Sequence, residues 1–182
     1  ERLPRDLASL SVGAVGFGNI GRKVAERYAG FDADVLAYDP YVDDEAIRAA
    51  GAMPASLSEL LAGADVVTLH VRLSEETEHL VGSDELETMN ESAFIVNTAR
   101  GGLVDENALV EALDAGGIAG AALDVFETEP LPEGDPLLGR ENVTLSPHTA
   151  GSTRDAVLNG SKIVVEGLLS ILDGEEPKHE VA

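Results

Sequence analysis

Six short apolar runs, separated by segments of helical character, restrict the folds open to this sequence of 182 residues. Most of the runs are continuous stretches of Val, Ile, Leu and Ala, which is typical of strands buried on both faces of a parallel sheet. We therefore predict an α/β fold, a doubly wound parallel sheet of the Rossmann type, in one domain with its core at about residues 10–174. The predicted strands are residues 11–17, 34–39, 65–71, 93–99, 120–125 and 142–146, with a shorter candidate at 52–56.

Three of the intervening helices can be placed from periodicity and end signals. Apolar residues recur every fourth position from Asn19 to Ala29, before Gly30 ends the pattern. A second helix is predicted from Asp105 to Ala115, and a third from Ser152 to Leu172. The sequence Ser-Thr-Arg-Asp at the start of the third predicts a capping box.

The chain is strongly acidic, with 34 acidic residues, 12 basic residues and a formal charge of −22 at pH 7. Such a charge repels nucleic acid and anionic membranes, so we predict neither as a partner. The acidic residues are spread in short groups, which favours a halophilic protein with a solvated acidic surface over an ordinary acidic cytosolic one. The absence of cysteine, and of any apolar run near the roughly 20 residues of a membrane span, predicts a cytoplasmic protein.

The segment Gly-Phe-Gly-Asn-Ile-Gly, from Gly16 to Gly21, joins the first predicted strand to the first predicted helix. Alone, this glycine pattern is a weak signal, but a position between strand and helix is the context in which it binds dinucleotides. Gly16 permits a tight turn, Gly18 lets a pyrophosphate approach the backbone, and Gly21 allows the helix to pack closely on the strand. The N–H groups at the helix N-terminus would then hold the pyrophosphate.

Asp39 ends the second predicted strand, 18 residues after Gly21. A carboxylate at that place accepts hydrogen bonds from the two hydroxyls of an adenosine ribose and repels a 2′-phosphate, and Pro40 adds bulk. The sequence therefore predicts NAD rather than NADP as cofactor. A structural turn beside a surface aspartate is the alternative.

Three polar side chains follow three different predicted strands: Arg100 the fourth, Glu129 the fifth and His148 the sixth. Open α/β sheets bind ligands at the carboxyl ends of their strands, so we expect the three to converge. A histidine can exchange a hydroxyl proton, a carboxylate can orient that histidine and raise its pKa, and a guanidinium can bind the oxygens of a 2-keto acid. This combination predicts hydride exchange with a small anionic substrate.

Four motifs, in this order and spacing, resemble those of the D-isomer-specific 2-hydroxyacid dehydrogenases: GFGNIG, NTARGGLVDE, LDVFETEP and SPHTAGST. The resemblance extends from about Leu10 to Gly174. It implies an oxidoreductase that transfers a hydride between NAD and a D-2-hydroxy or 2-keto acid of the phosphoglycerate, hydroxypyruvate/glyoxylate or lactate type. Arg100 would be the substrate-binding catalytic arginine, Glu129 the carboxylate partner and His148 the acid/base. Because relatives are usually dimers through this domain, a homodimer is expected.

The resemblance also implies cofactor contacts beyond the glycine motif. Asp124 would contact the nicotinamide carboxamide, and Thr98, Ala99 and Gly151 would line the nicotinamide site. The expected cofactor-binding residues are thus Gly16, Gly18, Asn19, Ile20, Gly21, Asp39, Thr98, Ala99, Asp124 and Gly151.

Two departures from the family pattern bear on function. Arg72 stands where the family commonly has proline, and it is either a cofactor contact or an ordinary loop residue. The glycine motif begins at residue 16, whereas family members carry a substrate domain of about a hundred residues before it. We therefore expect residues 1–182 to be the NAD-binding domain with the substrate domain missing, able to bind NAD but not to turn over a 2-keto acid.

Other readings of the sequence are weaker. An NAD-sensing binding module or corepressor-like protein without turnover is the main alternative, and a formate dehydrogenase is disfavoured because that enzyme carries glutamine where Glu129 stands. His70 is predicted to be structural, and His79 and His179 to lie on the surface. No His, Asp and Glu group has the local spacing of metal ligands, so no metal is expected. Gly160 and Gly167 indicate close packing of the last helix.

Overall fold

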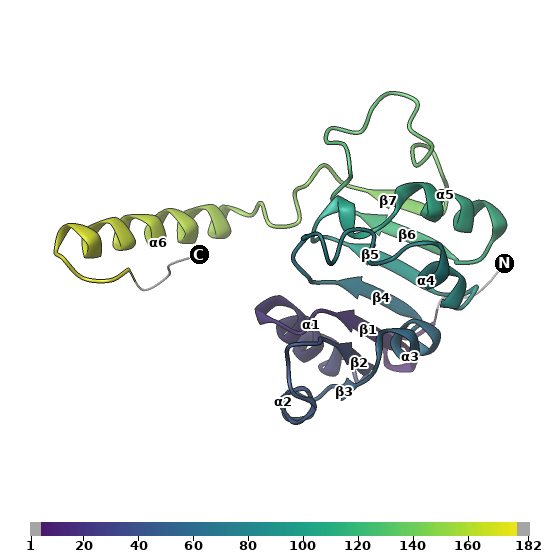
Figure 1. The fold of residues 1–182 in the computed structure, drawn as a ribbon, viewed down its shortest axis with the longest axis horizontal. Helices are drawn as coiled ribbons and strands as arrows, with labels where there is room; N and C mark the ends of the chain where they lie inside the picture. Colours follow the sequence, from purple (N-terminus) through teal and green to yellow (C-terminus); the bar gives the residue numbers. More distant parts are fainter. Residues whose placement is uncertain (1–4, 178–182) are drawn as a thin grey trace. The chain divides into compact units, whose positions relative to one another are not determined.

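The computed structural model describes residues 5–177 and divides the chain into two compact units, Glu1–Pro147 and His148–Ala182. His179 lies outside the described residues. The first unit contains a seven-stranded sheet in which each pair of neighbouring strands is parallel (Figure 1). Its strands are β1 (Ser11–Val15), β2 (Asp34–Tyr38), β3 (Met53–Pro54), β4 (Val66–Leu69), β5 (Phe94–Asn97), β6 (Gly120–Leu123) and β7 (Val143–Leu145).

The strand order is β3-β2-β1-β4-β5-β6-β7. The chain builds outward from β1 to β3, then crosses back to place β4 on the other side of β1. This reversal places the topological switch point between β1 and β4, and doubly wound sheets bind ligands at the carboxyl ends of the strands beside such a point. The α/β doubly wound fold predicted from the sequence is therefore confirmed.

Helices separate consecutive strands up to β6, and a long segment without a helix joins β6 to β7; parallel pairing requires such crossover connections. In the first unit they are α1 (Asn19–Ala29), α2 (Asp44–Ala49), α3 (Leu57–Gly63), α4 (Ser83–Thr88) and α5 (Glu106–Ala115), with 3₁₀ turns η1 (Leu7–Ser9) and η2 (Gly101–Leu103). The second unit contains α6 (Arg154–Leu172).

The core lies on both faces of the sheet. Ala14 and Val15 are consecutive residues of β1, both are fully buried, and they belong to two different apolar clusters. Ala14 packs with Phe17 and Ala25, whereas Val15 belongs to the larger cluster that includes Leu69. Since neighbouring side chains of a strand point to opposite faces, this double burial explains why the strand sequences are continuous apolar runs.

The predicted strands all exist, but each is shorter than its apolar run. The first run, for example, was taken to continue to residue 17, whereas β1 ends at Val15. Gly16 and Phe17 belong to the turn that follows, and Phe17 is still fully buried. Apolar residues therefore continue past the last ladder hydrogen bond because the loops at the carboxyl edge pack inward.

One expectation for the last helix is wrong. Its N-cap is Thr153 and not Ser152, because the Thr153 side chain accepts a hydrogen bond from the Ala156 N–H at 3.1 Å. The close packing expected at Gly160 and Gly167 stays a prediction. Within the described residues, a Cβ built on Gly160 would meet no atom within 4 Å. For Gly167 the corresponding contact is Pro177 at 3.8 Å, an ordinary van der Waals distance.

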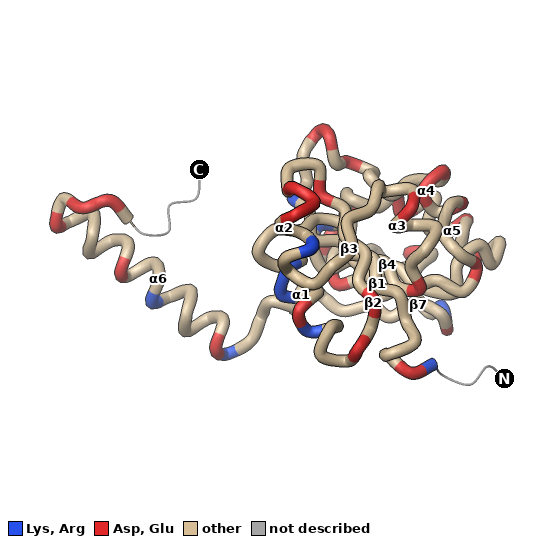
Figure 2. Tube along the Cα trace, turned by 90° about the horizontal axis from the view of Figure 1, so that it is seen from below, with Lys and Arg blue, Asp and Glu red and all other residues tan. Residues whose placement is uncertain are grey.

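Figure 2 marks the acidic residues along the chain, and most of them fall on helices and loops rather than on strands. Within residues 5–177, the one carboxylate among the buried polar side chains is that of Asp124. No helix in this part of the chain has the length and apolar character needed to cross a membrane.

Candidate active site

The glycine turn after β1 has the geometry that each of its glycines was predicted to provide. Gly16 has φ +92°, and a Cβ there would lie 2.7 Å from the backbone of His70. A Cβ on Gly21 would lie 2.1 Å from the carbonyl oxygen of Gly16. The turn is therefore pressed between α1 and the loop after β4, and both positions require glycine.

Gly18 differs from its two neighbours. It is exposed, it precedes the first residue of α1, and a Cβ there would meet no described atom within 4 Å. Space is thus open over the N-terminus of α1, where unpaired N–H groups and the helix dipole attract an anion. Asn19 and Ile20 form the exposed first turn of this helix, and the Ile20 side chain is 65% exposed. These residues fit the pyrophosphate of a dinucleotide.

Asp39 stands directly after β2 and connects the loops that follow β1 and β2. Its Oδ2 accepts the Phe17 N–H at 2.8 Å, and its Oδ1 accepts the Tyr41 N–H at 2.9 Å. These bonds fix the carboxylate beside the glycine turn. A carboxylate oxygen can accept a further hydrogen bond, so the group fits the predicted role with a ribose.

A guanidinium lies on the other side of the turn. Arg22 Nε donates to the carbonyl oxygen of Phe17 at 3.1 Å, and its guanidinium carbon lies 5.9 Å from the centroid of the Phe17 ring. Arg22 therefore brings positive charge to the glycine turn of a very acidic chain.

The turn that carries Arg100 is built around a buried asparagine at the end of β5. Asn97 is 1% exposed, its Nδ2 donates to the Arg100 carbonyl oxygen at 2.8 Å, and its Oδ1 accepts the Ala99 N–H at 3.1 Å. These bonds hold Thr98 and Ala99 in a tight turn and place Arg100 outside it. The Arg100 side chain is exposed and its Nη1 donates to the Ala99 carbonyl oxygen at 2.6 Å.

The Arg100 turn is in direct backbone contact with the loop that carries Glu129. A Cβ built on Gly101 would lie 1.9 Å from the Phe126 carbonyl carbon and 2.4 Å from the Glu127 nitrogen. Glu129 Oε1 in turn accepts the Phe126 N–H at 3.1 Å. The structure thus brings the arginine and glutamate segments together at one edge of the sheet.

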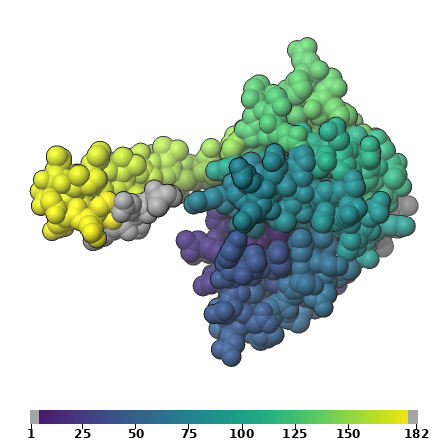
Figure 3. Space-filling model, viewed as in Figure 1, coloured from purple at the N-terminus to yellow at the C-terminus, as the bar shows by residue number. Residues whose placement is uncertain are grey.

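A long segment joins β6 to β7. Its part from Glu129 to Asn142 projects from the first unit and is green in Figure 3. Arg140 anchors its far end, because its two terminal nitrogens donate to both carboxylate oxygens of Asp114 at 2.7 and 3.2 Å. These hydrogen bonds lower the pKa of Asp114. The anchor connects the segment to α5.

Asp124 and Ser146 form a second polar pair at the same edge. Asp124 is 3% exposed, and its N–H donates to the Asn97 carbonyl oxygen at 2.9 Å. The Ser146 hydroxyl donates to Asp124 Oδ1 at 2.5 Å. Sequence reasoning singled out Asp124 but not Ser146, because the hydrogen bond joins two strand ends 22 residues apart.

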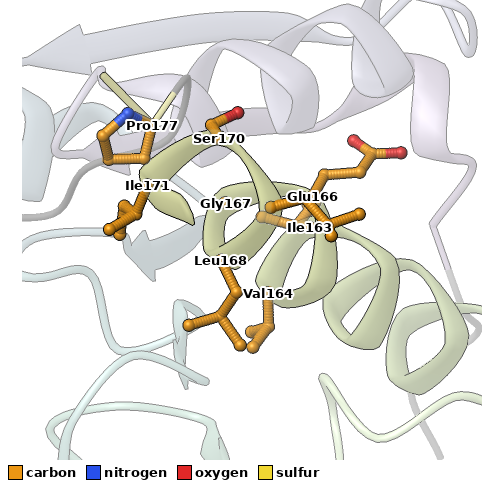
Figure 4. A pocket seen from close by; sticks show the side chains of 9 residues that line it. Ile163, Val164, Glu166, Gly167, Leu168, Ser170, Ile171 and Pro177 are labelled. Atoms are coloured by element: carbon orange, nitrogen blue, oxygen red, sulfur yellow. The ribbon is translucent and has the colours of Figure 1, made fainter. Parts of the chain in front are cut away.

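His148 and Gly151 belong to the second unit, so the convergence of His148 with Arg100 and Glu129 stays a prediction. His148 has φ +52°, a conformation that few residues other than glycine adopt. In the same unit, α6 carries exposed apolar side chains, and Figure 4 shows the groove lined by Ile163, Leu168 and Pro177 among others.

The loop after β4 contains His70, predicted to be structural, and Arg72, predicted to be either a cofactor contact or an ordinary loop residue. His70 Nε2 lies 3.1 Å from the Thr68 Oγ1, and burial lowers the pKa of His70. The predicted structural role fits this environment. Arg72 is exposed, and its carbonyl oxygen accepts the Thr77 hydroxyl at 2.7 Å. Its contact with a cofactor stays a prediction.

His79 is exposed, as predicted, but it also pairs with residues from distant segments. Its Nε2 lies 2.9 Å from Glu127 Oε1, and its Nδ1 lies 3.8 Å from Asp105 Oδ2. The three offer ligand atoms within 4.8 Å of one another, a group that local spacing in the sequence could not reveal. Since the two carboxylates face opposite ring nitrogens, we interpret the group as a polar cluster that connects three segments of the chain.

Comparison with known proteins decides the family. A family model described as the NAD binding domain of D-isomer specific 2-hydroxyacid dehydrogenases matches residues 1–150. The chain belongs to this family. The resemblance seen in the four motifs is therefore confirmed, and so is NAD as the cofactor of this 2-hydroxyacid dehydrogenase domain.

Relatives and solved structures agree with the family. A D-3-phosphoglycerate dehydrogenase of Archaeoglobus fulgidus is 43% identical over 169 residues, which cover 93% of this chain and 32% of that protein. A glyoxylate reductase of Korarchaeum cryptofilum is 43% identical over 176 residues, which cover 97% of this chain and 53% of that protein. The NAD-complexed D-isomer specific 2-hydroxyacid dehydrogenase of Lactobacillus delbrueckii ssp. bulgaricus superimposes with a TM-score of 0.90 at 33% identity, covering 99% of this chain and 58% of that one. This chain thus covers between 32% and 58% of the length of these three proteins.

Proposed function

We propose that this chain is the NAD-binding and catalytic part of an oxidoreductase that transfers a hydride between NAD and a D-2-hydroxy acid or its 2-keto acid. One observation supports the proposal above the others. The turn after Arg100 packs against the backbone that leads to Glu129, on the edge of the sheet that also carries the glycine turn. Substrate-binding and cofactor-binding groups therefore share one edge.

The cofactor would be held by the residues predicted from the sequence. Gly16, Gly18 and Gly21 leave room for the pyrophosphate over the first turn of α1, at Asn19 and Ile20. Asp39 would accept the ribose hydroxyls, while Thr98, Ala99, Asp124 and Gly151 would surround the nicotinamide. When bound, NAD supplies the ring that accepts or donates the hydride.

Arg100, Glu129 and His148 would then act on the substrate. The Arg100 guanidinium binds the carboxylate and carbonyl oxygens through its forked N–H donors. A ring nitrogen of His148 takes the hydroxyl proton during oxidation and returns it to the carbonyl oxygen during reduction. Glu129 holds the imidazole in place and stabilises its protonated form.

The substrate class and assembly follow from the relatives as proposals. Proteins similar to this chain are named D-3-phosphoglycerate dehydrogenase, glyoxylate reductase and D-lactate dehydrogenase. We propose a small acid of the phosphoglycerate, hydroxypyruvate/glyoxylate or lactate type, acted on by a cytoplasmic homodimer. A further domain would complete the substrate cleft.

The test is turnover by the gene product that carries this chain. With NADH and a panel of 2-keto acids, we expect reduction of at least one to the D-hydroxy acid. H148N removes the acid/base and should lower kcat/KM by about 100-fold or more, the size of general acid–base effects, while NAD still binds. R100Q removes the charged, forked contact to the substrate oxygens and should lower kcat/KM by about as much. NAD binding without turnover of any acid would contradict the proposal and support the binding-module alternative.

A further inference from the structure

Ser146 is the first residue after β7, and both its backbone N–H and its side-chain hydroxyl donate hydrogen bonds. Its N–H donates to the Leu123 carbonyl oxygen at 3.0 Å, which continues the ladder between β6 and β7. Its hydroxyl donates to Asp124 Oδ1 at 2.5 Å. Backbone and side chain therefore bind two consecutive residues of the neighbouring strand end, Leu123 and Asp124.

The acceptor of this bond is the buried carboxylate at the predicted nicotinamide site. Asp124 is 3% exposed, and its backbone N–H is bound to Asn97. Its main chain is thus fixed, and the orientation of the carboxylate depends on the hydrogen bonds that its oxygens accept. A distance of 2.5 Å lies in the range of hydroxyl donors to ionised carboxylates, which are among the stronger hydrogen bonds.

From this geometry we infer that Ser146 is a positioning residue, whose hydroxyl proton orients Asp124 to accept the amide N–H of the nicotinamide carboxamide. The inference rests on the proposed function, because Asp124 must face the nicotinamide. The Ser146 hydroxyl donates to Oδ1 and so restricts the rotamer of the Asp124 side chain. The Ser146 hydroxyl donates to Asp124, so its proposed effect on the cofactor acts through the Asp124 carboxylate.

The inference explains why a small hydroxyl residue suits this position. Alanine would leave a buried carboxylate with one hydrogen bond fewer, and that loss is costly. Threonine keeps the hydroxyl and favours extended backbone, so it should replace serine. The matched control is Thr144, an exposed hydroxyl residue of the same strand.

The test uses two cofactors that differ at the carboxamide. The 3-acetylpyridine analogue of NAD keeps the ring and the carbonyl but has a methyl group in place of the amide nitrogen. Calorimetric titration of the 182-residue chain should show that the wild type prefers NAD about tenfold, equivalent to about 1.4 kcal/mol. S146A should lose most of that preference, whereas S146T and the control T144A should keep it.

ADP-ribose, which has no nicotinamide, separates positioning from folding. Its affinity should be the same in the wild type and S146A within about twofold, because Asp124 lies away from the adenosine half. A role in folding alone would weaken NAD, the analogue and ADP-ribose together, and that result would overturn the inference. Unchanged discrimination by S146A would overturn the inference while leaving the proposed function intact. Absence of NAD binding to the wild type would overturn both.

Discussion

At the scale of single residues, the three glycines of the turn after β1 differ in what their positions require. Gly16 needs a positive φ, and Gly21 lies where a methyl group would clash with a carbonyl oxygen. Gly18 has neither constraint, because its backbone is extended and the space beside it is open. If Gly18 is retained for a ligand, its replacement should affect binding and not folding.

The variant G18A tests this separation. We expect its melting temperature to stay within about 2 °C of the wild type, because the new methyl group meets no atom of the protein. NAD binding should weaken by about 100-fold or more, since the methyl occupies the space of the pyrophosphate. Calorimetry and thermal unfolding measure the two effects.

G160A is the matched control for the same substitution. Gly160 lies inside α6 with no described atom within 4 Å of a built Cβ, so alanine should stabilise this helix slightly and leave NAD binding unchanged. An unfolded G18A, or one with normal NAD affinity, would speak against the assigned role of Gly18.

The sequence identifies a residue of the site only where its structural role depends on a short segment of the chain. Glycines in a turn and an aspartate after a strand are visible in a short segment, so Gly16, Gly18, Gly21 and Asp39 could be identified. The contact of Gly101 with Phe126 and the bond from Ser146 to Asp124 depend on which strands are neighbours. That order is fixed by the packing of the whole sheet, and a linear pattern does not contain it.

At the scale of elements, the apolar runs predict strands because both faces of the sheet are buried. The apolar runs do not predict where the strands end, because residues such as Phe17 remain buried after the ladder hydrogen bonds stop. The start of α6 shows a related limit. Ser152 and Thr153 are both residue types favoured at N-caps, serine more than threonine, and only the backbone geometry selects Thr153.

The charge of Glu106, the first residue of α5, lowers the free energy of unfolding, and this effect can be measured. Burial, followed by the nearby charges of Glu127 and Asp135, raises the pKa of Glu106, although a hydrogen bond from Glu127 opposes the shift. A raised pKa means that the folded state favours the neutral carboxyl. The penalty is absent below the unfolded value of about 4.5 and develops as pH rises through the folded pKa.

E106Q should therefore stabilise the chain at pH 7. Glutamine keeps an oxygen that can accept the Glu127 N–H, now bound at 2.8 Å, and removes the charge. Because Glu106 is partly exposed, we expect a rise in Tm of only about 1–3 °C, which disappears near pH 4. E111Q, at an exposed position of the same helix, should show no comparable pH-dependent gain. A lower Tm for E106Q at pH 7 would contradict the electrostatic assignment.

At the scale of the whole molecule, a charge of −22 and an anionic cofactor repel each other. Attraction must come from short-range groups such as the N-terminus of α1, Arg22 and Arg100. Salt screens the long-range repulsion more than these contacts, because the Debye length falls to about 3 Å at 1 M.

NAD binding should consequently tighten between about 0.1 M and 2 M KCl, which calorimetry at several salt concentrations can follow. Adenosine, an uncharged part of the cofactor, should show little of this change. Steady weakening of NAD binding with salt would argue against the halophilic interpretation of the acidic surface.

The central claim is that the glycine turn after β1 binds a dinucleotide and that Asp39 selects NAD. Calorimetric titration of the chain with NAD and with NADP tests it most directly. We predict saturable binding of one NAD per chain and binding of NADP at least about tenfold weaker, a difference of about 1.4 kcal/mol, because the carboxylate repels a 2′-phosphate. Equal affinity for the two cofactors, or no binding of NAD, would contradict the account.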